Sequence, residues 1–146
     1  MADGIFNFSK GAFVEMIRDT GSKTLVLLMQ ANEAEATLVD RTDIADLLIE
    51  AGNTEATATS YARKEGIVET VTEDLTNDRV DIDIPDQTWT PLGNGTNNTL
   101  TKLVTAYENA AADATRIPMS HHDFALTTDG SNVTATVAAA GIMRAA

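Results

Sequence analysis

The sequence predicts a β-dominated α+β fold, an antiparallel β-barrel or sandwich with two short helices in the N-terminal third. Three observations predict it. Apolar and polar residues alternate over 79–84, which places Val80, Ile82 and Ile84 on one face of a strand. Threonine, which suits exposed sheets, is abundant along the chain. Apolar residues at helical spacing fall in two segments of the first third. A chain of 146 residues is expected to form a single domain, 1–146.

The chain starts with a short apolar arm, residues 1–8, which contains Ile5, Phe6 and Phe8. An exposed arm of this kind favours association unless it is covered. Two interpretations stay open. The arm docks on a neighbouring subunit, or one of its phenylalanines packs the first helix against the core of the same chain.

The second portion, residues 9–52, is predicted to be helix, strand and helix. Ser9 is a suitable N-cap for a helix over about 10–20, and Gly21 is a suitable residue to end it. The inward stripe of this helix would be Ala12, Phe13, Met16 and Ile17.

Residues 23–31 form a nearly continuous apolar run of strand length, although their leucine content keeps helix as an alternative. A second helix is expected over about 43–51, capped by Asp40 or Thr42 and ended by Gly52 and Asn53. Its inward residues would be Ile44, Leu47 and Leu48.

The third portion, residues 58–146, is predicted to be antiparallel β structure. The tripeptide 76–78 reads as a turn, and 93–98 is the strongest loop signal. Asp129-Gly130-Ser131 is expected to join a hairpin between 124–128 and 133–137. Trp89 is expected to plug the core near a bulge after Pro85. The other predicted strands are 68–73, 79–84, 87–90 and 100–107, with a small-residue loop at 109–115 and a last apolar segment at 142–143.

The net charge of −12 is unevenly distributed. Residues 1–23 and 116–146 are each neutral, so residues 24–115 carry all of it. A nucleic-acid partner would need a basic surface, and an anionic membrane is disfavoured for the same reason. No apolar run reaches the roughly 18 residues that a membrane span needs. We therefore expect the two neutral ends to dock on a partner and the acidic middle to face solvent.

The residues that could carry chemistry form no recognisable site. The chain has no cysteine, which excludes disulfides, thiolate metal sites and cysteine nucleophiles. Gly93 and Gly95 lack the helix and lysine that a phosphate-binding loop needs, and there is no GxSxG motif. The serines are expected in caps, turns or polar strand positions; they include Ser9, Ser22, Ser60, Ser120 and Ser131.

Two groups of polar residues nevertheless need an interpretation. His121 and His122 are the only histidines, and Asp123 follows them. Neighbouring residues of a strand point to opposite faces, so we expect hydrogen bonding rather than a shared ion or an acid–base relay, with one histidine able to pair with Asp123. The aspartates of the second group suggest calcium, although their spacing is not that of an EF-hand and a solvated strand face explains them as well. They are Asp78, Asp81, Asp83 and Asp86. No catalytic residue, cofactor or metal site is predicted.

Longer stretches of the sequence resemble a family of small virion proteins of tailed bacteriophages. The segments that carry the resemblance are GIFNFSKGAFVEM at the start, TNDRVDIDIPDQTW (76–89), NNTLTKLVTAYE (97–108) and IPMSHHDFALTTDGSNVTATVAAAGIMRA (117–145).

The resemblance implies a non-enzymatic structural protein of the phage particle. It favours a capsid decoration (cement) protein on the head exterior that binds the major capsid protein and forms a homo-oligomer, preferably a trimer. A neck, vertex or tail position is the alternative, and a small calcium- or ligand-binding module is a more distant one. The docking ends then supply the expected partner contacts, which are Ile5, Phe6, Phe8, Phe13, Ile142 and Met143.

Overall fold

A computed structural model describes residues 3–19 and 23–145 of the chain, without the side chains of residues 14 and 16–18. The described helices are α1 (Asn7–Arg18), α2 (Glu35–Leu38), α3 (Ile44–Ile49) and the 3₁₀ helix η1 (Asp113–Thr115). The described strands are β1 (Gly4–Ile5), β2 (Thr24–Ala31), β3 (Thr54–Glu55), β4 (Lys64–Ile67), β5 (Thr70–Asp74), β6 (Arg79–Asp83), β7 (Gln87–Trp89), β8 (Thr99–Glu108), β9 (Arg116–Thr127), β10 (Val133–Ala135) and β11 (Met143–Ala145). The expected β-dominated α+β class is confirmed.

The largest sheet has six strands in the order β1-β9-β8-β2-β3, and β4 also pairs with β2. All of its pairings are antiparallel. Two smaller sheets complete the fold, β10-β7 and β11-β6-β5. Among the described residues no sheet closes on itself, so the barrel alternative of the prediction is wrong.

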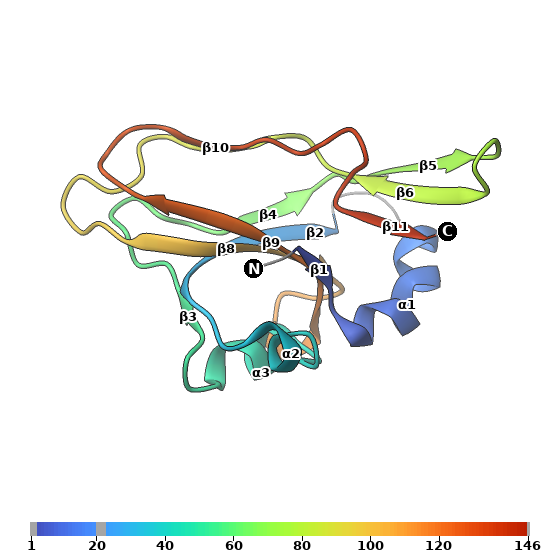
Figure 1. Ribbon diagram of the computed structural model, residues 1–146, viewed down its shortest axis with the longest axis horizontal. Coiled ribbons are helices and arrows are strands. Elements are labelled where there is room, and N and C mark those ends of the chain that lie inside the picture. Colours follow the sequence, from blue (N-terminus) through green and yellow to red (C-terminus); the bar gives the residue numbers. More distant parts are fainter. Residues whose placement is uncertain (1–2, 20–22, 146) are drawn as a thin grey trace.

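The two faces of the six-stranded sheet bury different partners (Figure 1). On one face, Leu25, Leu27 and Val104 pack against the residues of α2 and α3 and against Phe6. On the other face, Val26, Leu28 and Leu103 pack against the two smaller sheets, with Trp89 buried among them as expected. Alternate residues of β2 therefore serve opposite cores, which explains its nearly continuous apolar sequence.

The predicted helices exist with shifted boundaries. α1 starts at Asn7 rather than near residue 10, and Phe6 occupies the N-cap position. Ser9 is not the cap: it lies inside the first turn, where its buried hydroxyl donates to the carbonyls of Phe6 and Met119. Of the predicted stripe, Ala12 and Phe13 pack on the core, while the side chains of Met16 and Ile17, and Gly21, lie outside the described residues.

The cap of the third helix also differs from the prediction. Asp43, and neither Asp40 nor Thr42, caps α3 by accepting a hydrogen bond from the Asp46 N–H. At the other end, the Asn53 side chain donates to the Leu47 carbonyl, which satisfies a terminal backbone group. The expected inward residues Ile44, Leu47 and Leu48 pack into the core on this face, and the four-residue α2 was not predicted.

The predicted hairpin across 129–131 does not form. The turn is present, since Asp129 accepts from the Ser131 N–H and Gly130 has φ 94°. However, β10 pairs with β7, while β9 pairs with β8. Turn residues set the local reversal of the chain, but the strand that follows crossed to the other layer because its apolar side chains complete the core there.

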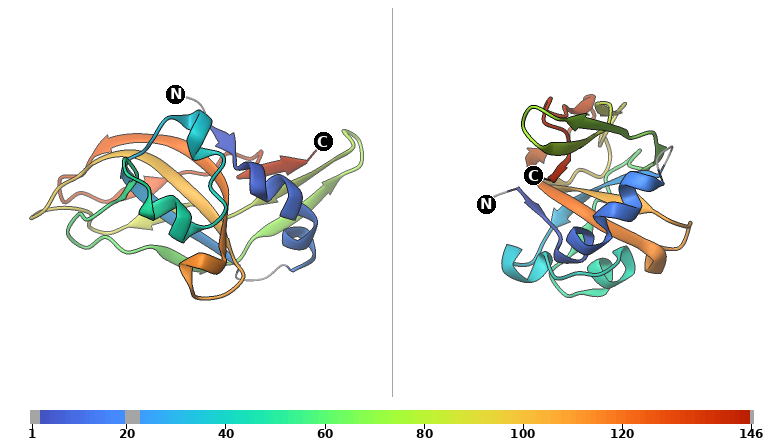
Figure 2. Two further views of the ribbon diagram at one scale, coloured as in Figure 1. Left: turned by 90° about the horizontal axis from the view of Figure 1, so that it is seen from below. Right: turned by 90° about the vertical axis from the view of Figure 1, so that its right-hand side faces the viewer.

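Both described ends of the chain take part in sheets. β1 pairs with β9, and β11 pairs with β6. In Figure 1, α1 and β11 lie at the same end of the molecule as the projecting β5–β6 hairpin. Seen from below in Figure 2, α2 and α3 lie in front of the long strands. The strand β9 occupies the outer part of the sheet next to β1, and the polar residues of interest gather there.

Candidate functional site

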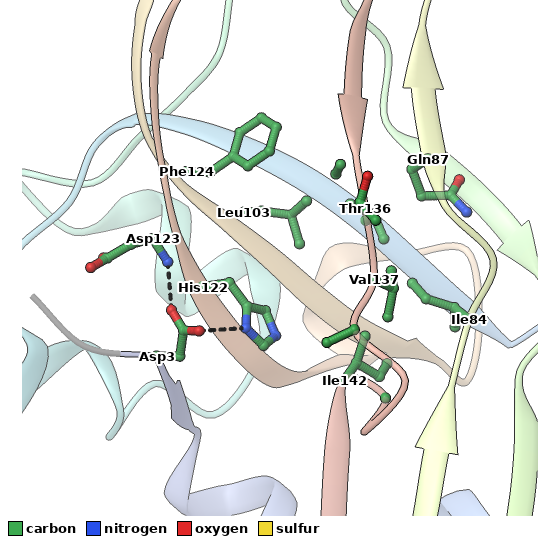
Figure 3. Close-up of a pocket in the computed structure, with 14 residues that line it drawn as sticks. Asp3, Ile84, Gln87, Leu103, His122, Asp123, Phe124, Thr136, Val137 and Ile142 are labelled. Carbon is green, nitrogen blue, oxygen red and sulfur yellow. Dashed lines mark hydrogen bonds and ion pairs between the residues drawn. The ribbon is translucent and has the colours of Figure 1, made fainter.

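A pocket of about 290 Å³ opens between the six-stranded sheet and the segment that follows β10 (Figure 3). Its interior is apolar, with Leu103, Phe124 and Ile142 among the lining residues. The polar residues Asp3, His122 and Asp123 also line it. Asp3 precedes β1 and the other two belong to β9, so the chain start and a strand more than a hundred residues later build this side together.

A line of hydrogen bonds runs from this pocket into the sheet. Asp3 Oδ2 lies 3.4 Å from His122 Nδ1, and His122 Nε2 lies 3.0 Å from Ser120 Oγ. Ser120 Oγ in turn lies 2.7 Å from the hydroxyl of Thr105. The other oxygen of Asp3 accepts the Asp123 N–H at 2.8 Å. Figure 3 shows the Asp3 carboxyl bridging these two groups of β9.

The order serine, histidine, aspartate matches the proton relay of nucleophilic hydrolases. A nucleophile also has to reach a substrate, and Ser120 is only 1% exposed and does not line the pocket. The Ser120 hydroxyl already pairs with the hydroxyl of Thr105 on the neighbouring strand β8. The line of hydrogen bonds therefore fastens the residues before β1 to β9 through Asp3.

The opposite face of β9 carries a second polar group. The Lys102 ammonium is fully buried and pairs with Asp123 at 2.7 Å and with Glu35 at 2.8 Å. Burial alone would lower the pKa of Lys102, but these two hydrogen bonds raise it above its usual value. This ion-paired lysine ties α2 to the central strands β8 and β9.

His121 lies on the same face as Lys102 and has no such partner. Its side chain is 1% exposed, and neither ring nitrogen has a hydrogen-bond partner in the described part of the chain. Burial lowers the pKa of His121 below its ordinary value of 6.5, so the ring is neutral at neutral pH. The two histidines thus point to opposite faces, as the strand alternation predicted. The carboxylate that His122 contacts is that of Asp3, whereas the Asp123 carboxylate pairs with Lys102.

The predicted partner-contact residues differ in what they offer to a partner. Phe8 is 49% exposed, while Ile5 and Phe13 are partly buried against the core. Phe6 is fully buried in its own chain, so the intramolecular interpretation of the arm holds for this residue. Ile142 and Met143 are also buried, at 6% and 4% exposure. As folded, these three side chains present almost no surface, and the docking prediction now depends mainly on Phe8.

Three of the four aspartates of the calcium hypothesis have partners of their own. Asp81 pairs with Arg144 and lies near Arg79, which hold its pKa below the usual range. Asp83 accepts from the Ile84 N–H, and Asp86 accepts from the Val137 N–H. Within the described residues, no three carboxylates or histidines lie close enough together to hold a metal ion.

Sequence reasoning did not find Asp3, Lys102 or the link between Ser120 and His122. The spacing of Ser120 and His122 is a usable signal, because residues two apart on a strand share a face. Nothing local connects Asp3 with His122, since their contact spans most of the chain.

Comparisons with known proteins add no relative: no family model, no curated protein and no solved structure matches this sequence. No helix in the described ranges is long and apolar enough to cross a membrane.

Proposed function

We propose that this chain is a structural protein of a tailed-phage particle, and specifically a decoration protein that binds the outer face of the head and bridges major capsid subunits. The observation that carries the proposal is the ordered resemblance of its segments to that family. Segments 76–89, 97–108 and 117–145 coincide with β6 to β11, apart from short loops. The resemblance thus involves the framework strands of both layers. In this proposal the chain folds as an open β-sandwich, and that sandwich is the unit that binds the capsid.

The surface offers apolar side chains that fit an assembly role. Phe8 is 49% exposed at the start of α1, and Leu75 is 83% exposed at the tip of the projecting β5–β6 hairpin. Val68 and Ile49 are exposed by 57% and 83%. Each such contact contributes little alone. Many copies on one shell would multiply modest contacts by multivalency, and the acidic middle of the chain would keep the protein soluble and away from DNA.

The location in the particle can be tested directly. Particles of the phage that encodes this chain would be labelled with gold-coupled antibodies against it and imaged by electron microscopy. Label over the head supports the decoration role. Label at the neck, a vertex or the tail replaces it with the alternative position. Absence of the chain from purified particles, checked by mass spectrometry, contradicts the whole proposal.

The contact surface needs a milder test than deletion of residues 1–8, because that deletion removes the buried Phe6 and disturbs the fold. Phe8→Asp changes an exposed side chain and should leave the fold intact while lowering occupancy on particles. Ile49→Asp makes the same change at an exposed apolar residue of α3, so the two variants together show which of these two surfaces contributes to occupancy. Equal occupancy of Phe8→Asp and the unmodified chain would rule out a docking role for Phe8.

A further inference from the structure

The buried ring of His121 is enclosed by the start of the chain. A Cβ atom on Gly4 would lie only 2.6 Å from His121 Nε2, so the backbone of β1 passes directly over the ring. The Phe6 ring meets it edge to face, with centroids 5.5 Å apart and planes at 86°. Enclosure by a bare backbone and an aromatic ring leaves both ring nitrogens without a partner among the described residues.

Few bonds hold this enclosure in place. Within the described residues, β1 pairs with β9 at Gly4↔His121 and Ile5↔Ser120, and the Asp3 carboxylate accepts the Asp123 N–H. The Phe6 N–H adds one bond to the Met119 carbonyl, at 3.0 Å. The Phe6 side chain supplies most of the attachment because it is fully buried. We call residues 3–6 the clasp. The clasp packs over the His121 ring.

The charges around His121 do not prepare it for a proton. Lys102 on β8 and His122 on β9 disfavour a charged ring, while Glu35 on α2 and Asp3 favour it. The carboxylates of Glu35 and Asp123 are engaged with Lys102, and Asp3 bonds to the other side of β9. A proton on His121 would leave a buried cation without a hydrogen-bond acceptor, which is costly.

We propose that His121 is an acid-sensitive latch: protonation of its ring releases the clasp from β9 and uncovers the outer edge of that strand. Release gives the imidazolium access to water, which removes the penalty of the unpaired buried charge. It also frees the backbone groups of residues 119–121 that β1 and Phe6 now satisfy. An uncovered strand edge is a site where another chain can add a strand.

The direction of the effect follows from linkage. Because burial lowers the pKa of His121 in the docked state, the docked state binds the proton less well than the released state. Docking is therefore complete above the ordinary value of 6.5 and weakens as the pH falls below it.

Hydrogen exchange on the full chain tests the latch. Protection factors, corrected for the intrinsic pH dependence of exchange, would be compared between about pH 7.5 and about pH 5. For peptides covering 3–9 and 117–122 we expect a loss of about ten-fold per pH unit at most, the limit for one proton. Peptides from β2 and β8 should change little. An unchanged protection of 3–9 across this range overturns the proposal.

Two variants separate the latch from general acid sensitivity. His121→Met should remove the pH-dependent loss. His122→Gln is the matched control: it changes the neighbouring histidine but leaves the His121 ring in place, so the loss should persist. An identical loss in His121→Met overturns the proposal. If His121→Met fails to fold, an NMR titration of the unmodified chain decides. The His121 ring and the Gly4–Phe6 amides should then share one midpoint, and separate midpoints contradict the latch.

Discussion

The strands β2 and β9 of the six-stranded sheet are covered on their outer sides in different ways. The edge at β2 is covered along its length by segments from the middle of the chain, because both β3 and β4 pair with it. Between them, the Ala56 N–H donates to the Leu28 carbonyl, and the Tyr61 hydroxyl accepts the Leu28 N–H. The edge at β9 pairs with the two-residue strand β1, and Asp3, Phe6 and Ser9 on either side of β1 add single hydrogen bonds to it.

Side-chain chemistry follows the same division. At the β2 edge, Arg63 binds Glu55 at 2.8 Å and Asp113 at 2.7 Å, so β3, the β4 side and the η1 loop are tied together by charge. At the β9 edge, the side-chain attachments are the buried Phe6, the Ser9 hydroxyl on the Met119 carbonyl, and the solvent-accessible Asp3, which contacts His122 and accepts the Asp123 N–H. The cover of the β2 edge thus does not depend on His121, whereas the cover of the β9 edge depends on the protonation state of His121 in the proposed latch.

The largest expected effect on stability comes from Phe6, which anchors the clasp at the β9 edge. Phe6→Ala should lower the free energy of unfolding by about 3–5 kcal/mol, since it removes a fully buried aromatic side chain. Urea denaturation measures it. Phe8→Ala, at a half-exposed position of the same segment, is the control and should stay within about 0.5 kcal/mol. Similar losses for both variants would show that the clasp is not anchored at Phe6.

The ion pairs of Arg63 at the β2 edge are the second target. Arg63→Gln should cost about 2 kcal/mol, between the values for exposed and buried ion pairs, because the side chain is 18% exposed. The hydrogen bond from Arg63 holds the pKa of Asp113 below its usual range, so this pKa should rise in the variant. Urea denaturation and an NMR titration of the carboxyl measure the two effects. An unchanged Asp113 titration would contradict the described network.

Gly4 tests the fit of the clasp over His121. Gly4→Ala places a Cβ 2.6 Å from the ring and should cost about 1–2 kcal/mol, with faster exchange of the amides in β1. Gly11→Ala in α1 is the matched control. Nothing lies within 4 Å of the added atom there, and the helix should gain about 0.5–1 kcal/mol. Equal responses of the two glycines would mean that β1 does not press on the His121 ring.

The smallest effect is expected from Asp3. Partial burial raises the pKa of its carboxyl, but the Asp123 N–H and His122 lower it more, so it lies below the ordinary 3.8. Its contribution to stability is therefore complete above pH 3.8 and is lost as the pH falls through the lower folded value. Asp3→Asn should cost a few tenths of a kcal/mol near neutral pH and nothing in strong acid. Denaturation curves at several pH values measure the difference, and a pH-independent cost would exclude an ionic role.

Sequence patterns predicted the local elements well where one periodicity dominates. The run 23–31 became β2, and the alternation of 79–84 became β6. The patterns failed where an element's role depends on distant residues. Ser9 was a plausible cap by residue type, yet the fold uses its hydroxyl to bind the Met119 carbonyl. The predicted hairpin failed for a similar reason, because β10 found its partner in β7.

The candidate site was predictable only in part. Strand alternation correctly separated His121 from His122, and it allows Ser120 and His122 to share a face. The partner of His122 is Asp3, and Gly4 covers the ring of His121. Both partners lie more than a hundred residues away in the sequence. No local pattern links these residues, because their contact depends on which strand the first residues join.

By itself, the sequence determined the β-dominated class, the approximate positions of strands such as β2, β6 and β8 along the chain, and the concentration of the net charge of −12 in residues 24–115. These properties follow from periodicity and composition, which act over a few neighbouring residues. The tertiary structure decided which strand edges are covered, that the neutral ends are largely built into the fold, and that one histidine is sealed beneath Gly4. Those outcomes depend on long-range pairing, where the burial of side chains such as Phe6 outweighs any local preference.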